Sequence, residues 1–520
     1  MRFLFIYPNH KGMTMLPPGI ALLSACLKQE GHEVKLFDTT IYNKIEYDNK
    51  TIVKDAEVEK AEKLNVRPVK KTNVKIKNLD TSPFEDLEEL IKDFEPEFLG
   101  LSCTEDMWEL GSALLTHIKK YKIRTIAGGV FPTFSPEIVL KSGFVDWVCK
   151  GEGEDALVEL LKKVEKGENW KDIPNLCFLE NNELKCNPTK VIDMDRNPTI
   201  DVKLFDKNRY YRPMSGSMYK MFPVETHRGC PYKCTFCNSP SQLTMYKSET
   251  NSNQLRRKSF ENIEKELLFY KNEMGAEYLY FWADTFFVWS KKELEKFAEI
   301  YQKINLPFWC QTRPETITEE RVNTLKGIGL HRMSLGVEHG NEKFRAKYIL
   351  RKMPNSLIVD KLNLLYDLKV SFSVNNIMGF PKETRELAFD TIKLNRRFKA
   401  NDRNCYPFTP FHGTGLRKLA EQLGYINKND ITSSMTTGQT PLDMPQFPRK
   451  EVEGLCKTFN FYVNFPEDRW DEIKIAENND DEGKEMYNKL KDEFVKEYWD
   501  GELSFEESAA ANDPHSALYS

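Results

Sequence analysis

Three cysteines lie close together in the stretch HRGCPYKCTFCNSP, residues 227–240. Three residues separate Cys230 from Cys234, and two separate Cys234 from Cys237. A structural zinc site normally has four ligands, often in C-x2-C pairs, whereas thiolates on one loop can hold three corners of a [4Fe–4S] cube. The fourth iron then lacks a protein ligand and can bind another molecule. The spacing therefore favours a cluster over zinc, and the open corner indicates catalysis rather than electron transfer.

The elements around this motif predict a partial barrel over residues 222–424. Short apolar runs alternate there with helical patterns: PVETH, EYLYFW, PFWCQT, RMSLGV, SFSVNN and RNCYPF. The cysteines follow the first of these runs, and in β/α barrels the carboxyl ends of the strands form the active face. Six β/α units therefore place the three thiols at the functional end of the barrel.

The rest of the chain is predicted to form a second α/β domain, a linker and a helical cap. Residues 1–167 alternate strand and helix patterns, which predicts a doubly wound parallel sheet. Within them, the lysine-rich residues 41–95 are expected to be a surface insertion with solvated charges. Residues 168–221 are rich in Asn, Pro and Asp and predict a linker, and 425–520 predict amphipathic helices over the barrel.

Composition narrows the functional classes. The 520 residues carry a net charge of −4 and a pI of about 6.2, so we expect no nucleic-acid partner. No apolar run is long enough to span a membrane, and the N-terminus lacks the features of a signal peptide. We therefore expect a cytoplasmic protein with reduced cysteines. Several cysteines are expected simply to fill the core: Cys26, Cys149, Cys177, Cys186 and Cys456.

The stretch RGCPYKCTFC resembles the signature of the radical S-adenosylmethionine (SAM) enzymes. Later stretches match that family at successive strand ends: FWADTFF, CQTRPE, MSLGVEHGNE and NNIMGFPKET. The resemblance implies a [4Fe–4S] cluster on the three cysteines, with SAM chelating the open iron and releasing a 5′-deoxyadenosyl radical. It also implies SAM contacts from Phe236, Asp284, Arg313, Ser334, Glu338 and Gly379.

The first domain resembles the cobalamin-binding domains that precede some radical SAM barrels. Small residues follow three of its predicted strands, where open α/β sheets bind ligands. The implied contacts are Ser102, Cys103, Thr104, Gly128, Gly129, Val130, Phe131, Gly151, Glu152 and Gly153. No D-x-H-x-x-G stretch is present, so we expect base-off cobalamin without a histidine ligand. A nucleotide or flavin domain is the competing interpretation, which the missing G-x-G-x-x-G fingerprint weakens.

Together the two resemblances imply a cobalamin-dependent radical SAM methyltransferase. Such an enzyme moves a methyl group from SAM through methylcobalamin to an unactivated carbon after hydrogen abstraction. Ring formation, rearrangement and methylation of phosphorus remain open alternatives. Other classes are a radical SAM enzyme with a vestigial first domain, a non-catalytic iron–sulfur electron-transfer protein and an RNA methylthiotransferase. The last of these usually carries a second cluster domain, and no second cysteine group is present.

The substrate side is expected after the sixth strand, in YPFTPFHGTG. Its candidates are Tyr406, Phe408 and His412, with a packed, barrel-closing turn as the alternative. Cys310 and Cys405 end strands nearby and are expected to be core residues. The substrate is expected to be a small molecule or a peptide. The family implies a reductant of the flavodoxin or ferredoxin type.

Overall fold

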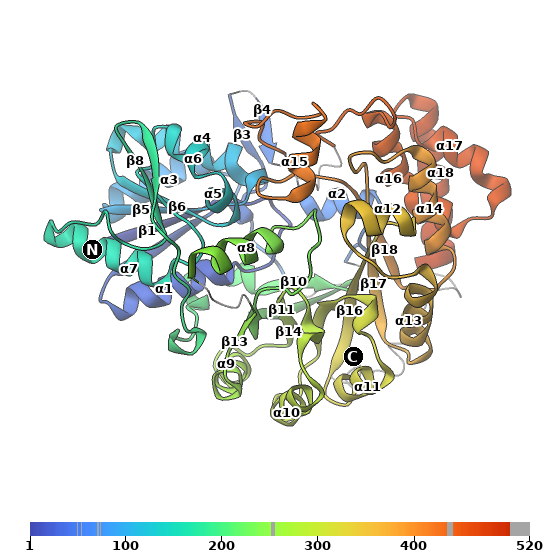
Figure 1. Ribbon diagram of the computed structural model, residues 1–520, viewed down its shortest axis with the longest axis horizontal. Helices are drawn as coiled ribbons and strands as arrows, with labels where there is room; N and C mark the ends of the chain where they lie inside the picture. Colours follow the sequence, from blue (N-terminus) through green and yellow to red (C-terminus); the bar gives the residue numbers. More distant parts are fainter. Residues whose placement is uncertain are drawn as a thin grey trace.

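The computed structural model describes residues 1–48, 50–53, 55–69, 72, 74–250, 255–433 and 440–499. Figure 1 shows two α/β units side by side, with the C-terminal helices beside the second unit. This α/β architecture, with a doubly wound domain, a partial barrel and a helical C-terminal region, confirms the predicted fold class.

The first sheet has the strand order β2-β1-β5-β6-β7-β8-β9. Its parallel strands are β1 (Arg2–Tyr7), β2 (Glu33–Asp38), β5 (Phe98–Ser102), β6 (Arg124–Gly128) and β7 (Trp147–Cys149). Taken by themselves, they have the order 2-1-3-4-5, in which ligands bind where the strand order reverses, between the first and third strands.

Helices cover both faces of this sheet because its strands are apolar on both sides. Phe3 and Phe5 pack with α1 (Pro18–Gln29) and α7 (Glu154–Lys166). The alternate residues Leu4 and Ile6 pack on the opposite face. The helices on that face are α3 (Pro83–Phe94), α4 (Trp108–Ile118) and α6 (Pro136–Lys141).

The prediction that residues 41–95 form a surface insertion is wrong for two parts of this range. Helix α3 belongs to the domain core, because Leu87 and Ile91 are buried on the sheet. Helix α2 (Ala56–Glu62) does not pack on the first sheet but contacts the second unit. There Tyr487 donates a hydrogen bond to the Glu62 carbonyl at 2.6 Å. Figure 1 shows α2 near β18, away from the first sheet. The strands β3 (Ile45–Tyr47) and β4 (Lys50–Val53) form a separate hairpin. Parts of the insertion, residues 49, 54, 70, 71 and 73, lie outside the described residues.

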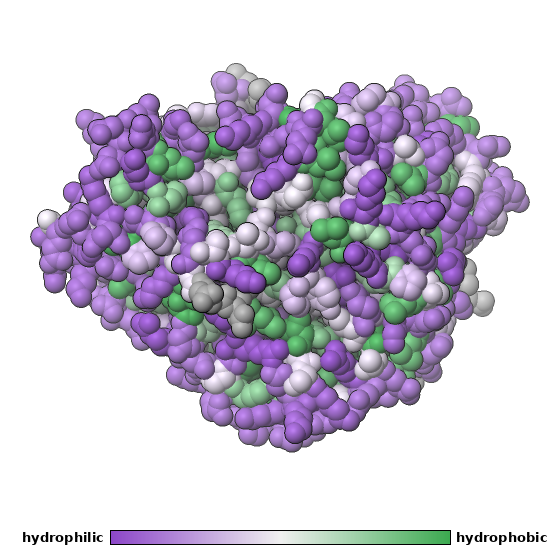
Figure 2. Space-filling view, in the orientation of Figure 1, coloured by the Kyte–Doolittle hydropathy of each residue, from purple (hydrophilic) through white to green (hydrophobic). Residues whose placement is uncertain are grey.

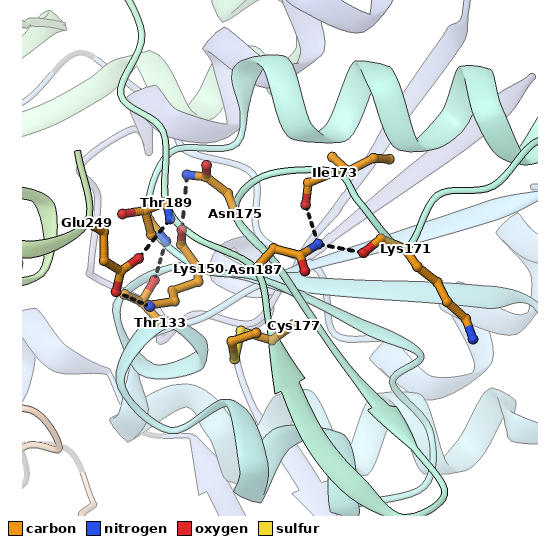
Figure 3. Close-up of a disulfide and its surroundings, with 11 residues drawn as sticks. Thr133, Lys150, Lys171, Ile173, Asn175, Cys177, Asn187, Thr189 and Glu249 are labelled. Atoms are coloured by element: carbon orange, nitrogen blue, oxygen red, sulfur yellow. Dashed lines mark hydrogen bonds and ion pairs between the residues drawn. A yellow bond between two sulfur atoms is a disulfide. The ribbon is translucent and has the colours of Figure 1, made fainter.

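The predicted linker also contains regular structure. Strands β8 (Leu176–Glu180) and β9 (Glu183–Cys186) extend the first sheet in the antiparallel direction. Their register places Cys177 opposite Cys186, with Cα atoms 4.1 Å apart, and the two form a disulfide (Figure 3). The expectation of two reduced, separate core thiols is therefore wrong for this pair. The other nine cysteines are free.

The second sheet has the strand order β10-β11-β14-β15-β16-β17-β18. Its strands are β10 (Tyr211–Met214), β11 (Ser217–Val224), β14 (Tyr278–Phe281), β15 (Phe308–Thr312), β16 (Leu330–Glu338), β17 (Ser371–Met378) and β18 (Asp402–Pro407). All are parallel except β10, so β11 and β14 to β18 are the six strands of the predicted barrel. The sheet is open, because β10 and β18 do not pair with each other.

Helices between these strands cover the outer face of the curved sheet: α9 (Phe260–Asn272), α10 (Lys291–Tyr301), α11 (Glu319–Lys326), α13 (Asn355–Asp367) and α14 (Arg385–Asn395). The helix after the cysteine motif, α8 (Ser239–Thr250), lies between the two units in Figure 1. The C-terminal helices are α15 (Gly415–Gln422), α16 (Arg449–Asn464), α17 (Trp470–Ala476) and α18 (Asp481–Phe494), and they share a core with β18. No helix among the described residues is both long and apolar enough to cross a membrane.

Candidate active site

One cavity of about 860 Å³ lies between the two units. Its walls come from the carboxyl ends of β5, β6 and β7 on one side, and of β14, β16, β17 and β18 on the other. Figure 2 shows hydrophobic and neutral residues gathered toward the middle of the molecule's face, whereas hydrophilic residues dominate its rim. Because the carboxyl ends of both sheets face it, this cavity is the default ligand site of both units.

The three cysteines lie on one loop at the barrel end of this cavity. The loop follows β12 (His227–Arg228) and leads into α8. Gly229 has a φ of 95°, a conformation that glycine adopts readily. Cys237 lines the cavity. Burial raises the pKa of Cys230 to about 12 and also raises that of Cys237, so these thiols need a nearby cation, such as bound metal, to ionise.

Protein groups contact two of the three sulfur atoms. Arg313 Nη1 donates a hydrogen bond to Cys234 Sγ at 3.1 Å, and Ser239 N donates to Cys237 Sγ at 3.4 Å. Within the described part of the chain, no group of three or more His, Cys, Asp or Glu side chains is arranged to hold a single metal ion. The loop supplies three free thiols, which is the number of protein ligands that three corners of a cluster require.

Three of the predicted SAM contacts line the cavity: Phe236, Asp284 and Glu338. Asp284 Oδ2 accepts a hydrogen bond from Ser239 Oγ at 2.9 Å, beside Cys237. Burial raises the pKa of Asp284 and also that of Glu338, against the opposing effect of Arg351, whose Nη1 lies 2.7 Å from Glu338 Oε1. Within the described part of the chain, Asp284 has no such arginine partner, so it is the better acceptor for a ligand's ammonium group.

The other three predicted SAM contacts lie away from the cavity wall. Arg313 stacks on Tyr232, 3.7 Å from the ring centroid, and pairs with Glu315. Ser334 accepts hydrogen bonds from Ser373 and Asn375, and only the last of these reaches the cavity.

Gly379, the third of these residues, faces the C-terminal cap. Its N–H donates to Glu383 Oε2 at 2.6 Å, and a Cβ at this position would lie 2.8 Å from Val452 in α16. Gly379 therefore belongs to the packing of the cap against the barrel.

Most of the predicted cobalamin contacts form the opposite wall of the cavity. They are Ser102, Gly128, Gly129, Val130, Gly151, Glu152 and Gly153. Gly129 and Gly151 have φ values of 106° and 87°, which other residues rarely adopt. Cys103 and Phe131 instead lie in the core of the first domain, and the Thr104 hydroxyl donates a hydrogen bond to Asp106 Oδ1.

Part of the cavity wall, called here the slot, lies in the first domain between its sheet and one layer of helices. Phe3, Phe5 and Ile126 line the sheet side, and Leu23 and Leu157 line the helix side. Gly100 leaves room for the rings, because a Cβ there would lie 2.6 Å from the Phe3 ring. The sequence signal for this slot is a glycine inside the apolar strand FLGLS.

The predicted substrate residues divide between two roles. Tyr406 and Phe408 line the cavity. His412 is instead buried against the first domain. Its backbone N–H donates a hydrogen bond to Glu105 Oε2 at 2.7 Å, and its ring atom Nδ1 lies 2.9 Å from Glu105 Oε1. Cys310 and Cys405 are buried in the protein core, as expected.

A largely buried ion network joins the two units at the cavity, and sequence reasoning missed it. Arg228, just before the first cysteine, pairs with Glu154 at 2.7 Å, with Glu152 at 3.2 Å and with Glu225 at 3.0 Å. Arg256 pairs with Glu152 from the other side. Charged residues at helix starts and strand ends look like ordinary solvated groups in a sequence, so only the fold reveals this network.

Comparison with known proteins agrees with this geometry. The profile of the radical SAM superfamily matches residues 224–394, and that of the B12 binding domain matches residues 68–161. The chain carries both domains. The radical SAM domain holds the cysteine loop, and the B12 binding domain provides the glycine-rich wall of the cavity.

Individual relatives are distant. An uncharacterized methyltransferase of Pyrococcus horikoshii is 26% identical over 393 residues, which cover 74% of this chain and 81% of that protein. The anaerobic magnesium-protoporphyrin IX monomethyl ester cyclase of Cereibacter sphaeroides is 24% identical over 60% of this chain and 51% of its own length. The solved structure of OxsB, a cobalamin-dependent SAM radical enzyme with aqua-cobalamin and SAM bound, has a TM-score of 0.62 at 16% identity, covering 94% of this chain and 70% of that one.

Proposed function

We propose that this protein is a cobalamin-dependent radical SAM methyltransferase that methylates an unactivated carbon of its substrate. The observation that carries the proposal is the single cavity that the cysteine loop and the glycine-rich loops of the B12 binding domain share. When bound, the [4Fe–4S] cluster supplies the electron that cleaves SAM to a 5′-deoxyadenosyl radical, and cobalamin supplies the methyl group. The protein's own task is to orient these groups around the substrate.

On the barrel side, Cys230, Cys234 and Cys237 would hold the cluster. Asp284 would accept hydrogen bonds from the SAM ammonium group, because it lines the cavity beside Cys237 and Ser239 is its one hydrogen-bonding side chain among the described residues. Phe236 would lie against the adenine. These roles follow from chemical fit: a buried carboxylate favours a cationic neighbour that offsets its desolvation.

On the first-domain side, the glycine loops would let the corrin approach the backbone, and the slot along Phe3, Phe5 and Gly100 would take its nucleotide tail. Among the described residues, the one histidine that lines the cavity is His227, in the barrel. No histidine of the described part of the first domain lines this cavity. We therefore propose base-off cobalamin without a histidine ligand.

Transfer of a labelled methyl group tests this function. Anaerobically reconstituted protein with hydroxocobalamin, SAM carrying a trideuterated methyl group, a flavodoxin or ferredoxin system and a metabolite extract should yield a product with three deuterium atoms. Formation of 5′-deoxyadenosine without any deuterated product would contradict methyl transfer.

A second candidate is a ring-forming or rearranging reaction on the same cofactors. The similarity to the protoporphyrin ester cyclase favours it. The same assay separates the two, because cyclisation or rearrangement yields a product without added deuterium.

A further inference from the structure

The cysteine loop has a side that faces the cavity and an outer side. Cys237 lines the cavity together with Asp284, whereas Cys234 does not line it. A cluster on this loop would therefore have a cavity side, where SAM is proposed to bind, and an outer side at Cys234. Because SAM cleavage consumes an electron from the cluster, an external donor has to supply that electron. The outer side is the one that the proposed SAM and substrate sites leave free.

Two stacked side chains connect the outer side of the loop with the protein surface. Arg313 Nη1 donates a hydrogen bond to Cys234 Sγ at 3.1 Å, and the Arg313 guanidinium carbon lies 3.7 Å from the centroid of the Tyr232 ring. Tyr232 is partly exposed, and its neighbours Pro231 and Lys233 are exposed. A donor that docks at Tyr232 would therefore lie close to the sulfur atom of Cys234.

Two other segments pack on the loop from outside, and both bond to Thr235. The Thr235 N–H donates to the Ile349 carbonyl at 3.3 Å, and its hydroxyl donates to the Tyr348 carbonyl. The Thr235 carbonyl accepts a hydrogen bond at 2.9 Å from the N–H of Leu416, at the start of α15. Ile349 ends the π-helical turn Arg345–Ile349. One surface, called here the outer surface, is therefore formed by residues 231–235, 345–352 and 415–418.

The outer surface is cationic, although the whole chain has a net charge of −4. Within the described part of the chain, its exposed ammonium groups form no ion pair with a carboxylate. A cationic surface attracts anionic partners over a distance and orients them before contact. Four exposed lysines belong to it: Lys233, Lys347, Lys352 and Lys418.

An exposed leucine lies among these charges. Leu350 is 44% exposed and has a φ of 57°, which is uncommon for a residue with a bulky side chain. It directly follows Ile349, whose carbonyl bonds to the cysteine loop, and it lies between Lys347 and Lys352 in the chain. An apolar contact with a charged rim is the usual composition of a protein–protein interface.

We infer that the outer surface is the docking site of an acidic electron-carrier protein, which reduces the cluster at Cys234. One electron leaves the carrier and one enters the cluster, so no bond forms or breaks. Charge complementarity favours this partner, because carboxylates on the carrier would meet the four lysines of the outer surface. The inference rests on the proposed function, since the cluster needs this donor only if it cleaves SAM.

Binding of a fluorescently labelled acidic flavodoxin to the full-length protein tests the docking site. Lys347→Glu and Lys418→Glu each reverse one charge of the outer surface. We expect each variant to weaken binding about fivefold in fluorescence anisotropy, and binding to the wild-type protein should weaken as the salt concentration rises. Lys292→Glu is the matched control, because Lys292 is also exposed but lies on α10, on the outer face of the barrel. Equal affinities of the three variants would overturn the inference, as would binding of an RNA oligonucleotide in place of flavodoxin.

The choice of reductant separates this inference from the proposed function. With dithionite, a small reductant that needs no docking site, Lys347→Glu and Lys418→Glu should release 5′-deoxyadenosine at the wild-type rate. With reduced flavodoxin as the donor, the KM for flavodoxin should rise about fivefold while kcat changes little. An unchanged KM would overturn the docking site. Failure of the wild-type protein to release 5′-deoxyadenosine with dithionite would instead refute the proposed function, and the binding result would stand apart from it.

Discussion

At the scale of single residues, the site depends on side chains whose environments differ although their chemistry is similar. Among the carboxylates on the cavity wall, Glu152 and Glu338 are paired with arginines, whereas Asp284 has Ser239 as its hydrogen-bonding side chain. This difference follows from position, because Asp284 lies just beyond β14, beside the cysteine loop. It explains why Asp284, and not Glu338, is the better candidate for the SAM ammonium group.

Cys234→Ala should abolish both cluster assembly and SAM cleavage. Removing one of three thiolates leaves two irons of the cube without protein ligands, so the cluster is no longer held. Iron and sulfide content after reconstitution, together with 5′-deoxyadenosine by mass spectrometry, measures the effect. Cys310→Ala is the control, because Cys310 is buried on the outer face of the barrel sheet. Cleavage that persists in Cys234→Ala would disprove the assignment of the cluster.

Gly128→Leu should block cobalamin without disturbing the fold. A Cβ on Gly128 meets nothing closer than 3.8 Å, so the larger side chain extends into the cavity. We expect the affinity for hydroxocobalamin to fall at least about tenfold while the unfolding temperature changes little. Corrin absorbance after desalting and calorimetry measure the two effects. Gly327→Leu, at the exposed end of α11, serves as the control; equal corrin retention by both variants would place the corrin elsewhere.

At the scale of elements, one buried carboxylate ties a loop of the first domain to the chain after β18. Glu105 follows β5 and accepts hydrogen bonds from the backbone of His412 and Thr432, and Arg417 lies 3.3 Å from it. Burial raises the pKa of Glu105, but the bonds from His412 and Thr432 outweigh burial and lower it overall. The loop that carries Phe408 is thereby fixed against the B12 binding domain.

Glu105→Gln should destabilise the protein by about 3 kcal/mol at pH 7, because buried Arg417 loses its anionic partner. A lowered carboxyl pKa stabilises the fold above the ordinary glutamate pKa of about 4.3. The difference in the free energy of unfolding between variant and wild type should therefore disappear as the pH falls below this value and through the lower pKa of folded Glu105. Urea unfolding at several pH values measures it, with exposed Glu109→Gln as control. A difference that persists unchanged at acidic pH would contradict this role.

The elements show where sequence reasoning succeeds and where it fails. The cysteine loop, the glycine loops and the alternation of strands and helices depend on short-range patterns, and all three were visible in the sequence. The position of residues 62–69 was not visible in the sequence, because Asn65 and Arg67 contact residues of β18, far along the chain. The pairing of Cys177 with Cys186 depended on a hairpin register inside a stretch that looked irregular. His412 was predicted to face the substrate, because its true partner, Glu105, lies in the other domain and far away in the sequence.

At the scale of the whole molecule, the two domains form one site because buried charges hold them together. Arg228 contacts Glu152 and Glu154 of the first domain and Glu225 of the second, close to the first cysteine. A shift of one domain would leave these charges buried and unpaired. The cavity is therefore expected to keep its shape when the cofactors are absent.

Arg228→Gln should lower the free energy of unfolding by about 3 kcal/mol, the usual cost of removing one partner from a buried ion network. Guanidinium denaturation of the cofactor-free protein measures the loss. Arg196→Gln is the matched control, since the Arg196 side chain is 65% exposed and lies 3.6 Å from Asp155 of the first domain. A surface pair contributes at most about 1 kcal/mol. Equal unfolding midpoints for the two variants would refute the role of the network.

The most direct test of the central claim, that the shared cavity performs radical SAM chemistry, is the release of 5′-deoxyadenosine. Anaerobically reconstituted protein is incubated with SAM and dithionite, with and without hydroxocobalamin, and the nucleoside is quantified by mass spectrometry. We expect 5′-deoxyadenosine from the wild-type protein and none from Cys234→Ala. A reconstituted wild-type protein that contains iron and sulfide but leaves SAM intact would contradict the claim.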